Sequence, residues 1–517
     1  AAYKLAADID MSNSLQTWKP IDTFGGILDG DGHKLMNLTI DDNNGKAGLF
    51  RQTEEGTQIK NIIITDPTLV VNPQTTYAGF VAGATTKTSI TDIHVYGARI
   101  EGNGSTDAIG GLIGQGTTYT AIASSSFNGV INLPETSVAG GIVGNMRTGT
   151  TADHCAATGT FTAANTLGGI VGETERDANV TNCRVDAAIK AQNTVGGIVG
   201  VDNNKGLITN CIANGTIDAD APTRWGKFAV GGIAGELVEA TDVTGNIMNA
   251  EINVTAEPNV TTDPDTGAEI DLTAKAMKSV HRIAGYTIVN AAEDAGGKAE
   301  DKGFAKNYAT TAVKWNDAAV EYTDDTTSEG ATKSVADLTT DFLKGIGFAY
   351  GNTAAEPWKE AGKLPVLYFE NIPMSLTLSQ SAVNVVENES VRIVATLYGA
   401  DPSMIDVVSS DNSVAEAEIV EEGDNSITIE VKCKKTGTAT ITATAGTLTA
   451  TCLINGVTTA IDGITADGNG PAITFRDGNI VADGASRISV YNINGQLAAD
   501  NAGSTMSTSG MSKGVYV

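Results

Sequence analysis

Val195–Gly200 reads V-G-G-I-V-G, and close copies of this string recur through the first half of the chain. The copies are Ile109–Gly114, Ala139–Gly144, Leu167–Gly172 and Val230–Gly235, with a weaker form at Ala78–Gly83 and a remnant at Gly48-Leu49-Phe50. Between the second glycines of the five full strings the spacings are 30, 28, 28 and 35 residues. A repeat of this length is typical of a solenoid, in which each unit stacks on the one before it.

Two further short elements lie between consecutive glycine strings. Val180–Val185 and Ile208–Ile212 are examples of the second element, and Gly215–Ala219 is an example of the third. Three strands and three corners per repeat predict a parallel β-helix, and parallel crossovers favour a right-handed one. Equivalent positions in the second element predict about eight turns: Ile62, Ile93, Ser125, Cys155, Cys183, Cys211, Asn246 and Asn307.

Composition limits the classes of partner. The 517 residues carry 61 acidic and 33 basic side chains, a formal net charge of −28, so nucleic acid and anionic membrane surfaces are disfavoured. No apolar run is long enough for a transmembrane helix, and we expect a monomer without membrane insertion. The chain shows no signal peptide, but it opens in mid-pattern, which is consistent with removal of an upstream segment.

The first 50 residues carry a family resemblance. The strings D-I-D-M-S, W-K-P-I and F-G-G-I-L-D-G-D-G-H-K-L resemble the opening of GLUG-repeat proteins, a β-helical family of bacterial surface proteins. The later G-G-I-V-G and N-C strings match the repeat of that family, and the resemblance covers roughly residues 1–370. It implies a secreted or surface-displayed adhesin or other interaction protein from a Bacteroidetes-like bacterium.

The rest of the chain predicts two more modules, giving an all-β protein with boundaries at 1–371, 372–457 and 458–517. Strands with turn signals predict a β-sandwich in the second module: Ser375–Leu378, Ser390–Leu397, Ser426–Lys432, Thr438–Ala443 and Thr447–Leu453. Ser409–Ala415 and Gly437–Ala443 resemble bacterial Ig-like group 2 domains. Ile488–Gln496 and Gly514–Val517 resemble the C-terminal β-sandwich of secreted Bacteroidetes proteins, some of which are sorting signals, and this module is expected to be incomplete.

Two segments interrupt or close the predicted solenoid. Residues 254–278 read as a hairpin-like insertion, and loops of this kind often carry binding sites. Phe342–Phe348, Trp358 and Leu364–Tyr368 are expected to form the cap that covers the last open sheet edge.

Candidate metal ligands are few. Asp29 and Asp31 alternate on a glycine-rich turn, while Asp263, Asp265, Glu269 and Asp271 form the densest acidic cluster. Oxygen ligands of this kind suit Ca²⁺, the one cofactor considered, but the EF-hand continuation is missing and solvated turns are the preferred interpretation. The same interpretation holds for Asp8 and Asp10.

No catalytic or cofactor-binding residue is assigned. His33, His94, His154 and His281 lie outside any H-E-x-x-H motif, and the repeat residues are mostly Thr, Asn, Ala and Gly. We therefore expect a non-enzymatic interaction protein that binds a host or matrix protein or a polysaccharide. The alternative is a carbohydrate-active β-helix enzyme or a glycan-binding protein that uses the insertion.

The cysteines follow the repeat. Cys155, Cys183 and Cys211 are each 28 residues apart, so they should occupy one position in three successive turns and face the core. Parallel side chains about 4.8 Å apart fit a disulfide poorly. A reduced, buried thiol ladder that serves packing is predicted, while pairing of Cys433 with Cys452 stays open.

Overall fold

The computed structural model shows an all-β chain of two compact units, Ala1–Glu370 and Asn371–Val517. The structure describes residues 1–517 except 13–16, 104–106, 204, 221–227, 239–240, 256–259, 263–266, 268, 272–278, 288–302, 312, 316–325, 362–363, 371–374, 424, 447, 458–472, 477–478, 492–496 and 509–517.

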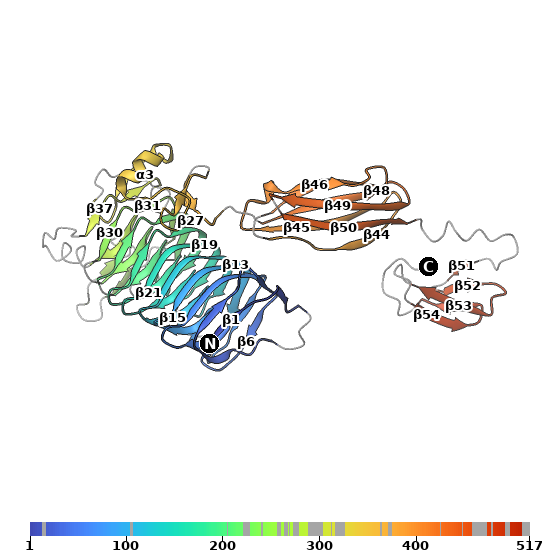
Figure 1. The fold of residues 1–517 in the computed structure, drawn as a ribbon, viewed down its shortest axis with the longest axis horizontal. Coiled ribbons are helices and arrows are strands. Elements are labelled where there is room, and N and C mark those ends of the chain that lie inside the picture. The colour runs from blue at the N-terminus through green and yellow to red at the C-terminus, as the bar shows by residue number, and fades with distance from the viewer. Residues whose placement is uncertain are drawn as a thin grey trace. The chain divides into compact units, whose positions relative to one another are not determined.

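The first unit is a parallel β-solenoid, and its strands stack in successive layers from the blue to the yellow-green end in Figure 1. Each turn of the solenoid, called a coil below, contributes strands to three hydrogen-bonded sheets. One sheet has eight strands: β7 (Lys46–Ala47), β11 (Tyr77–Ala78), β14 (Ala108–Gly110), β17 (Val138–Gly140), β20 (Thr166–Gly168), β24 (Thr194–Gly196), β28 (Ala229–Gly231) and β35 (Val280–His281). Eight strands bound seven complete coils, against the eight or so predicted.

The second sheet has nine strands: β3 (Ile21–Phe24), β8 (Phe50–Thr53), β12 (Ala82–Thr86), β15 (Ile113–Thr118), β18 (Val143–Met146), β21 (Val171–Thr174), β25 (Val199–Asp202), β29 (Ala234–Leu237) and β36 (Ala284–Thr287). Its strands also pair in parallel with neighbours one coil away, as in the register Val143↔Val171.

The third sheet has 21 strands, because several coils contribute more than one strand to it. They are β1 (Ala2–Lys4), β2 (Ile9–Asp10), β4 (Ile27–Asp29), β5 (Lys34–Met36), β6 (Thr39–Asp41), β9 (Gln58–Thr65), β10 (Thr68–Val71), β13 (Ser89–Gly102), β16 (Ala121–Leu133), β19 (Thr151–Ala163), β22 (Asn179–Thr181), β23 (Arg184–Ala191), β26 (Leu207–Thr209), β27 (Ile212–Asp220), β30 (Asp242–Thr244), β31 (Ile247–Met248), β32 (Glu251–Thr255), β37 (Phe304–Ala305), β38 (Tyr308–Ala309), β39 (Val313–Trp315) and β40 (Ala331–Thr332).

This third sheet bends at one left-handed residue per coil. The bend residues have φ between 51° and 70°: Asn61, Asp92, Ser124, His154, Asn182, Asn210, Gly245 and Lys306. Asn, Asp and Gly tolerate this conformation better than other residues, which accounts for five of the eight. Each bend residue directly precedes one of the eight positions predicted to be equivalent, and all eight of those side chains are buried. That part of the sequence prediction is confirmed.

The glycine strings form the corner between the eight-stranded and nine-stranded sheets. A Cβ atom on Gly141 would lie 2.1 Å from the carbonyl oxygen of Gly169, in the next coil. A Cβ on Gly140 would lie 2.0 Å from the carbonyl oxygen of Val143, and one on Gly144 would lie 2.7 Å from the amide nitrogen of Ile109. Backbone therefore packs directly against backbone at this corner, and only glycine fits at all three positions.

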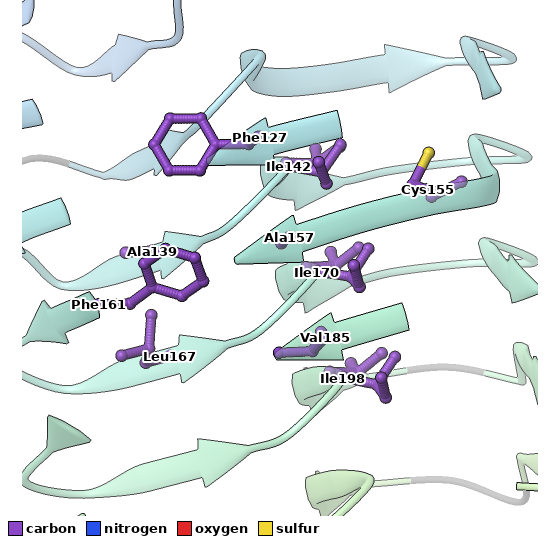
Figure 2. Close-up of a cluster of buried hydrophobic side chains, with 14 of the residues drawn as sticks. Phe127, Ala139, Ile142, Cys155, Ala157, Phe161, Leu167, Ile170, Val185 and Ile198 are labelled. Carbon is purple, nitrogen blue, oxygen red and sulfur yellow. The ribbon is translucent and has the colours of Figure 1, made fainter. Parts of the chain in front are cut away.

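Apolar side chains fill the interior in columns that run from coil to coil. Figure 2 shows Ile142, Ile170 and Ile198 stacked in one column, with Phe127 and Phe161 on the opposite side of the core. The Phe127 and Phe161 ring centroids are 5.9 Å apart, and all five side chains are almost fully buried. Burial of such columns supplies the main favourable term in folding.

The last coil has two larger residues where the earlier coils have corner glycines. His281 and Arg282 stand where the preceding coil has Gly231 and Gly232, because no full coil follows to exclude their side chains. The Arg282 side chain is only 1% exposed. Its Nε donates to the carbonyl oxygen of Glu329 at 3.0 Å, one Nη donates to Thr332 Oγ1 at 2.7 Å, and the other donates to the Gly330 carbonyl.

The closing segment departs from the predicted cap. Residues 328–333 cover the last coil, with Ile283 donating to the Ser328 carbonyl at 2.9 Å. Residues 339–370, called the strap below, include helix α3 (Thr340–Ile346) and strands β41 (Trp358–Lys359) and β42 (Val366–Leu367). The strap runs back along the side of the solenoid, because Phe342 contacts Tyr308 of the last part while Phe369 contacts His94 of an early coil.

The second unit contains two four-stranded sheets. One has the order β43 (Ser375–Leu378), β45 (Ser390–Tyr398), β48 (Ser426–Cys433) and β47 (Ala415–Glu422), and the other β44 (Ala382–Val386), β50 (Leu448–Val457), β49 (Gly437–Ala445) and β46 (Asp406–Ser409). Residues of both sheets share one apolar cluster, and the five predicted strands are all present.

Five short strands follow in the C-terminal residues. They are β51 (Ile473–Arg476), β52 (Asn479–Ala482), β53 (Arg487–Tyr491), β54 (Leu497–Ala502) and β55 (Thr505–Ser507). β51, β52 and β55 form one antiparallel sheet, and β53 pairs with β54.

Gly169→Ala tests the corner. The new Cβ would lie 2.1 Å from the Gly197 carbonyl oxygen and 2.7 Å from a Val185 methyl group, so we expect a loss of about 3 kcal/mol or more in the free energy of unfolding. Gly345→Ala is the control, because that helical position has open space and should gain about 0.5–1 kcal/mol. Denaturant unfolding measures both, and an unchanged midpoint for Gly169→Ala would contradict the corner assignment.

Candidate functional site: the corners and outer faces of the solenoid

The three repeat cysteines lie where the sequence placed them. Cys155, Cys183 and Cys211 are fully buried and unbridged in consecutive coils. Beyond packing, each thiol contacts backbone carbonyls: Cys183 Sγ lies 3.1 Å from the Thr181 oxygen and 3.5 Å from the Ala152 oxygen. The left-handed bend interrupts the strand, and the inward polar atom satisfies backbone groups there. The prediction of simple apolar filling was therefore incomplete.

At the equivalent position of neighbouring coils, Ser and Asn side chains also form hydrogen bonds with the backbone. Ser125 Oγ accepts from the Ile93 amide at 3.1 Å, and Asn246 Oδ1 accepts from the Cys211 amide at 2.9 Å. Asn307 Nδ2 donates to the Val243 carbonyl at 2.7 Å. Ser, Cys and Asn at this position thus have a shared role, which the repeat spacing alone could not reveal.

Cys433 and Cys452 do not pair. A Cβ atom on Gly456 would lie 2.8 Å from Cys433 Sγ, and Cys452 is four residues away from Gly456 on the same strand. Four residues of a strand span about 13 Å, well beyond disulfide reach. Both thiols are buried in the second unit.

The carboxylates of Asp29 and Asp31 are occupied by protein groups. Asp29 Oδ1 accepts from the Asp31 amide and from Asn61 Nδ2, both at 2.9 Å. Lys60 Nζ lies 3.4 Å from Asp29, and Lys4 Nζ lies 2.8 Å from Asp31. These contacts support the preferred interpretation of a side-chain-capped turn.

The acidic insertion is described only in part. β33 (Val260–Thr262) and β34 (Glu269–Asp271) form an antiparallel pair, as the hairpin prediction requires. Asp263 and Asp265 lie outside the described residues, and nothing follows for the side chains of Glu269 and Asp271. Among the residues that the structure describes, no group of three or more His, Cys, Asp or Glu side chains is arranged to hold a metal ion.

The histidines have separate structural surroundings. His33 Nδ1 lies 3.0 Å from Asp8 Oδ1, and His281 Nδ1 lies 2.6 Å from Glu329 Oε1. His154 lies 3.4 Å from Asp153. His94 is buried beside Ser126, whose Oγ is 2.9 Å from Nδ1, and burial lowers the pKa of His94 to about 4. The four histidines lie in different parts of the first unit, with His94 on β13 and His281 on β35, and the structure does not bring them together.

A stripe on the outer side of the 21-stranded sheet lies beneath the strap. Register pairs define it: His94, Ser126, Ala156, Arg184, Ile212, Ile247 and Tyr308. Arg184 donates to Glu370 of the strap at 2.8 Å and to Asp186 at 2.7 Å. Because both carboxylates lie beside this buried guanidinium, the pKa of Arg184 is raised despite the opposing effect of desolvation. The strap therefore covers the stripe, so a binding partner cannot reach it. The sequence did not indicate this.

The row next to this stripe is a ladder of polar side chains. Asn128 Nδ2 donates to Thr158 Oγ1 at 2.8 Å, and Asn214 Nδ2 donates to Asp186 Oδ1 at 2.7 Å. Asn249 continues the ladder by donating to Asn214 at 2.5 Å. Carboxylates on this face accept hydrogen bonds from neighbouring coils, an arrangement that suits stacking.

The corner between the nine-stranded and 21-stranded sheets carries a row of exposed side chains, called the corner ridge below. Its members are Glu55, Lys87, Tyr119, Arg147, Arg176, Asp177 and Lys205. The backbone of this corner is hydrogen-bonded from coil to coil: Gly56 donates to the Lys87 carbonyl at 3.0 Å and Gly149 donates to the Arg176 carbonyl at 3.0 Å. This row was not predicted from the sequence. Part of its signal lies before buried threonines at the repeat spacing: Lys87 precedes Thr88 and Tyr119 precedes Thr120, whereas glycine precedes Thr57 and Thr150.

Comparisons with known proteins identify the repeat. A family model described as the GLUG motif matches residues 163–190, a span of 28 residues that equals one coil. This chain therefore carries a GLUG repeat within its β-solenoid. No helix among the described residues has the length and apolar character needed to cross a membrane.

Individual relatives match only parts of the chain. Halomucin from Haloquadratum walsbyi (strain DSM 16790 / HBSQ001) is 30% identical over an alignment of 171 residues, and the match covers 30% of this chain and 2% of halomucin. Domains 4 and 5 of the S-layer protein SbsC are 22% identical over 18% of this chain and 58% of that chain, with a TM-score of 0.16. Domains 5–6 of the same protein are 18% identical over 25% of this chain and 67% of that chain, also with a TM-score of 0.16. TM-scores this low do not establish a shared fold.

Thiol labelling tests the inward ladder. All five cysteines are buried, and burial together with neighbouring thiols raises the pKa of Cys183 well above its usual value. We expect no rapid labelling of native protein at pH 8 and five labelled thiols after denaturation. Cys155→Ser should change the free energy of unfolding by less than about 1 kcal/mol, because Ser125 fills the same position one coil earlier. A Cys155–Cys183 or Cys183–Cys211 bridge in a non-reducing peptide map would contradict the ladder.

His94 should make stability depend on pH. Its pKa is about 4 in the folded protein against 6.5 as the ordinary value, so the unfolded chain binds more protons between these pH values. Stability should therefore fall as pH drops from 7 to 4, by about 3 kcal/mol more in the wild type than in His94→Gln. Denaturant midpoints of both proteins across this range measure the difference, and parallel curves would show that His94 is not buried in its neutral form.

Proposed function

We propose that this chain is a non-enzymatic binding scaffold of a secreted or cell-surface protein, and that its solenoid binds an extended partner. The observation that carries the proposal is the arrangement of outward side chains in rows that run from coil to coil, of which the corner ridge is exposed. A row that repeats every ~4.8 Å matches a polymer with a short repeat better than a compact small molecule. A polysaccharide is therefore the favoured class of partner.

The surroundings of the carboxylates support a role without catalysis. Asp153 accepts from Thr181 and Asn182, and Asp186 accepts from Arg184 and Asn214. General acid–base chemistry on a glycan needs two carboxyl groups that face a shared reaction centre. The carboxylates of this outer face are instead held by neighbouring coils of the solenoid.

Location and module identity belong to the same proposal. The GLUG match and the partial likeness to halomucin support a surface or secreted role. Adhesion, in a Bacteroidetes-like bacterium, is the finer role that we propose from the family resemblance. The two four-stranded sheets support an Ig-like spacer, and the five short C-terminal strands support a further β-sandwich. A right-handed solenoid is the expected hand, since parallel crossovers are almost always right-handed.

A binding array and an activity panel test the proposal. The full chain should bind at least one polysaccharide or matrix protein on the array, and it should release no reducing ends or unsaturated sugars from a polysaccharide panel. Product formation above the protein-free control would instead favour the carbohydrate-active enzyme, and residues 254–278 would then be the first to mutate. Absence of binding to every array member would count against the scaffold role.

A further inference from the structure

Tyr119 is unusually exposed for its size. Its relative exposure is 62%, above that of the other exposed large apolar side chains in the described part of the first unit, namely Tyr3, Ile9 and Ile21. The ring lies over Gly149 of the next coil, because a Cβ atom on that glycine would be 2.4 Å from the ring carbons Cδ1 and Cε1. Because Gly149 has no side chain, the tyrosine ring can pack on its backbone, and much of the ring stays exposed to solvent.

The backbone conformation at this position favours glycine rather than tyrosine. Tyr119 has φ of 43°, and Lys87, one coil earlier, has φ of 44°. At the corresponding corners Gly56 and Gly149 adopt this region without the steric cost that a Cβ atom brings. Large side chains at such positions lower stability, so their presence points to a role outside folding.

Cations gather on the same ridge. The sequence has seven Lys and Arg residues between positions 61 and 223, and four of them belong to the corner ridge: Lys87, Arg147, Arg176 and Lys205. This clustering contrasts with the net charge of −28 for the whole chain. The ridge also carries Glu55 and Asp177, so its four cations outnumber its two carboxylates, and an anionic ligand meets less repulsion there than the net charge of the chain implies.

The ion pairs of the ridge are weak enough to be exchanged. Lys87 Nζ lies 2.8 Å from Glu55, and Arg147 Nε lies 3.3 Å from Glu175, with side chains that remain 29% to 68% exposed. Ion pairs of this exposure contribute little to stability. The anionic groups of a ligand can therefore replace Glu55 and Glu175 as partners of these cations.

We propose that the corner ridge binds an acidic polysaccharide, with a sugar ring stacked on Tyr119 and anionic groups paired with Arg147, Arg176 and Lys205. This proposal rests on the proposed scaffold function and names its ligand class and surface. An aromatic ring suits the apolar face of a pyranose, and one cation in each of three successive coils suits regularly spaced carboxylates or sulfates. An acidic peptide offers the charges without the repeated ring faces, so it is the less favoured partner.

The test uses the full chain and polygalacturonate in affinity electrophoresis or calorimetry. Dextran serves as the neutral glycan, and polyglutamate serves as a polyanion without sugar rings. The wild type should bind polygalacturonate more tightly than either control polymer. Binding should weaken as salt concentration rises, because charge pairs contribute to it.

Variants separate binding from folding. Tyr119→Gly should raise the melting temperature, because glycine accepts the positive φ, while it weakens polygalacturonate binding by about tenfold. Arg176→Gln with Lys205→Gln should weaken binding and reduce its salt dependence. Arg99→Gln is the matched control, since Arg99 is an exposed cation on a strand of the 21-stranded sheet, and it should bind like the wild type.

Several results would overturn the proposal. Equal binding of polyglutamate would reduce the ridge to a general anion patch, and equal binding of dextran would remove the acidic requirement. Unchanged affinity in Tyr119→Gly and in the double variant would place the ligand elsewhere and leave the scaffold function standing. No binding of polygalacturonate, with a matrix protein or another glycan bound on the array, would reject the ridge assignment but not the scaffold.

Discussion

The structure depends on a close approach of backbone to backbone at the glycine corner. The space at Gly141 is closed by the Gly169 carbonyl of the next coil, and the space at Gly140 is closed by Val143 of its own coil. This contact brings two sheets together without intervening side chains and fixes the direction in which the chain enters the next coil. The buried isoleucines and the inward thiols repeat from coil to coil in step with that corner.

The stacking of coils must also stop, and a residue at the same corner stops it. Arg282 occupies the position of a corner glycine, and its side chain fills the space that the backbone of a further coil would need. Its hydrogen bonds to Glu329 and Thr332 then hold the closing segment in place. One residue thus blocks further stacking and also recruits the segment that covers the last edge, which protects the solenoid from strand addition at that end.

Sequence reasoning succeeded where the repeat is regular and failed where contacts join distant segments. The equivalence of Cys155, Cys183 and Cys211 follows from spacing alone, because every coil returns to the same place. The strap could not be placed in this way, since its pairing of Glu370 with Arg184 joins residues 186 positions apart and has no periodicity. The corner ridge was missed for another reason. The residues at this corner have no common side chain, and what most of them share is a left-handed conformation: Gly56, Lys87, Tyr119, Gly149, Arg176, Asp177 and Lys205.

The course of the strap decides how the first unit would carry mechanical load. The chain leaves this unit at Glu370, beside Arg184 in the middle of the stack, although the last coil includes Val280, His281 and Tyr308, much further along the solenoid. Tension entering from the second unit would act first on the Arg184–Glu370 pair and on the contact of Phe369 with His94. Strands of the terminal coil could otherwise detach one at a time. That coil would bear the tension only after the strap had detached from several coils. A tether that joins a stack at its side in this way loads many coils together.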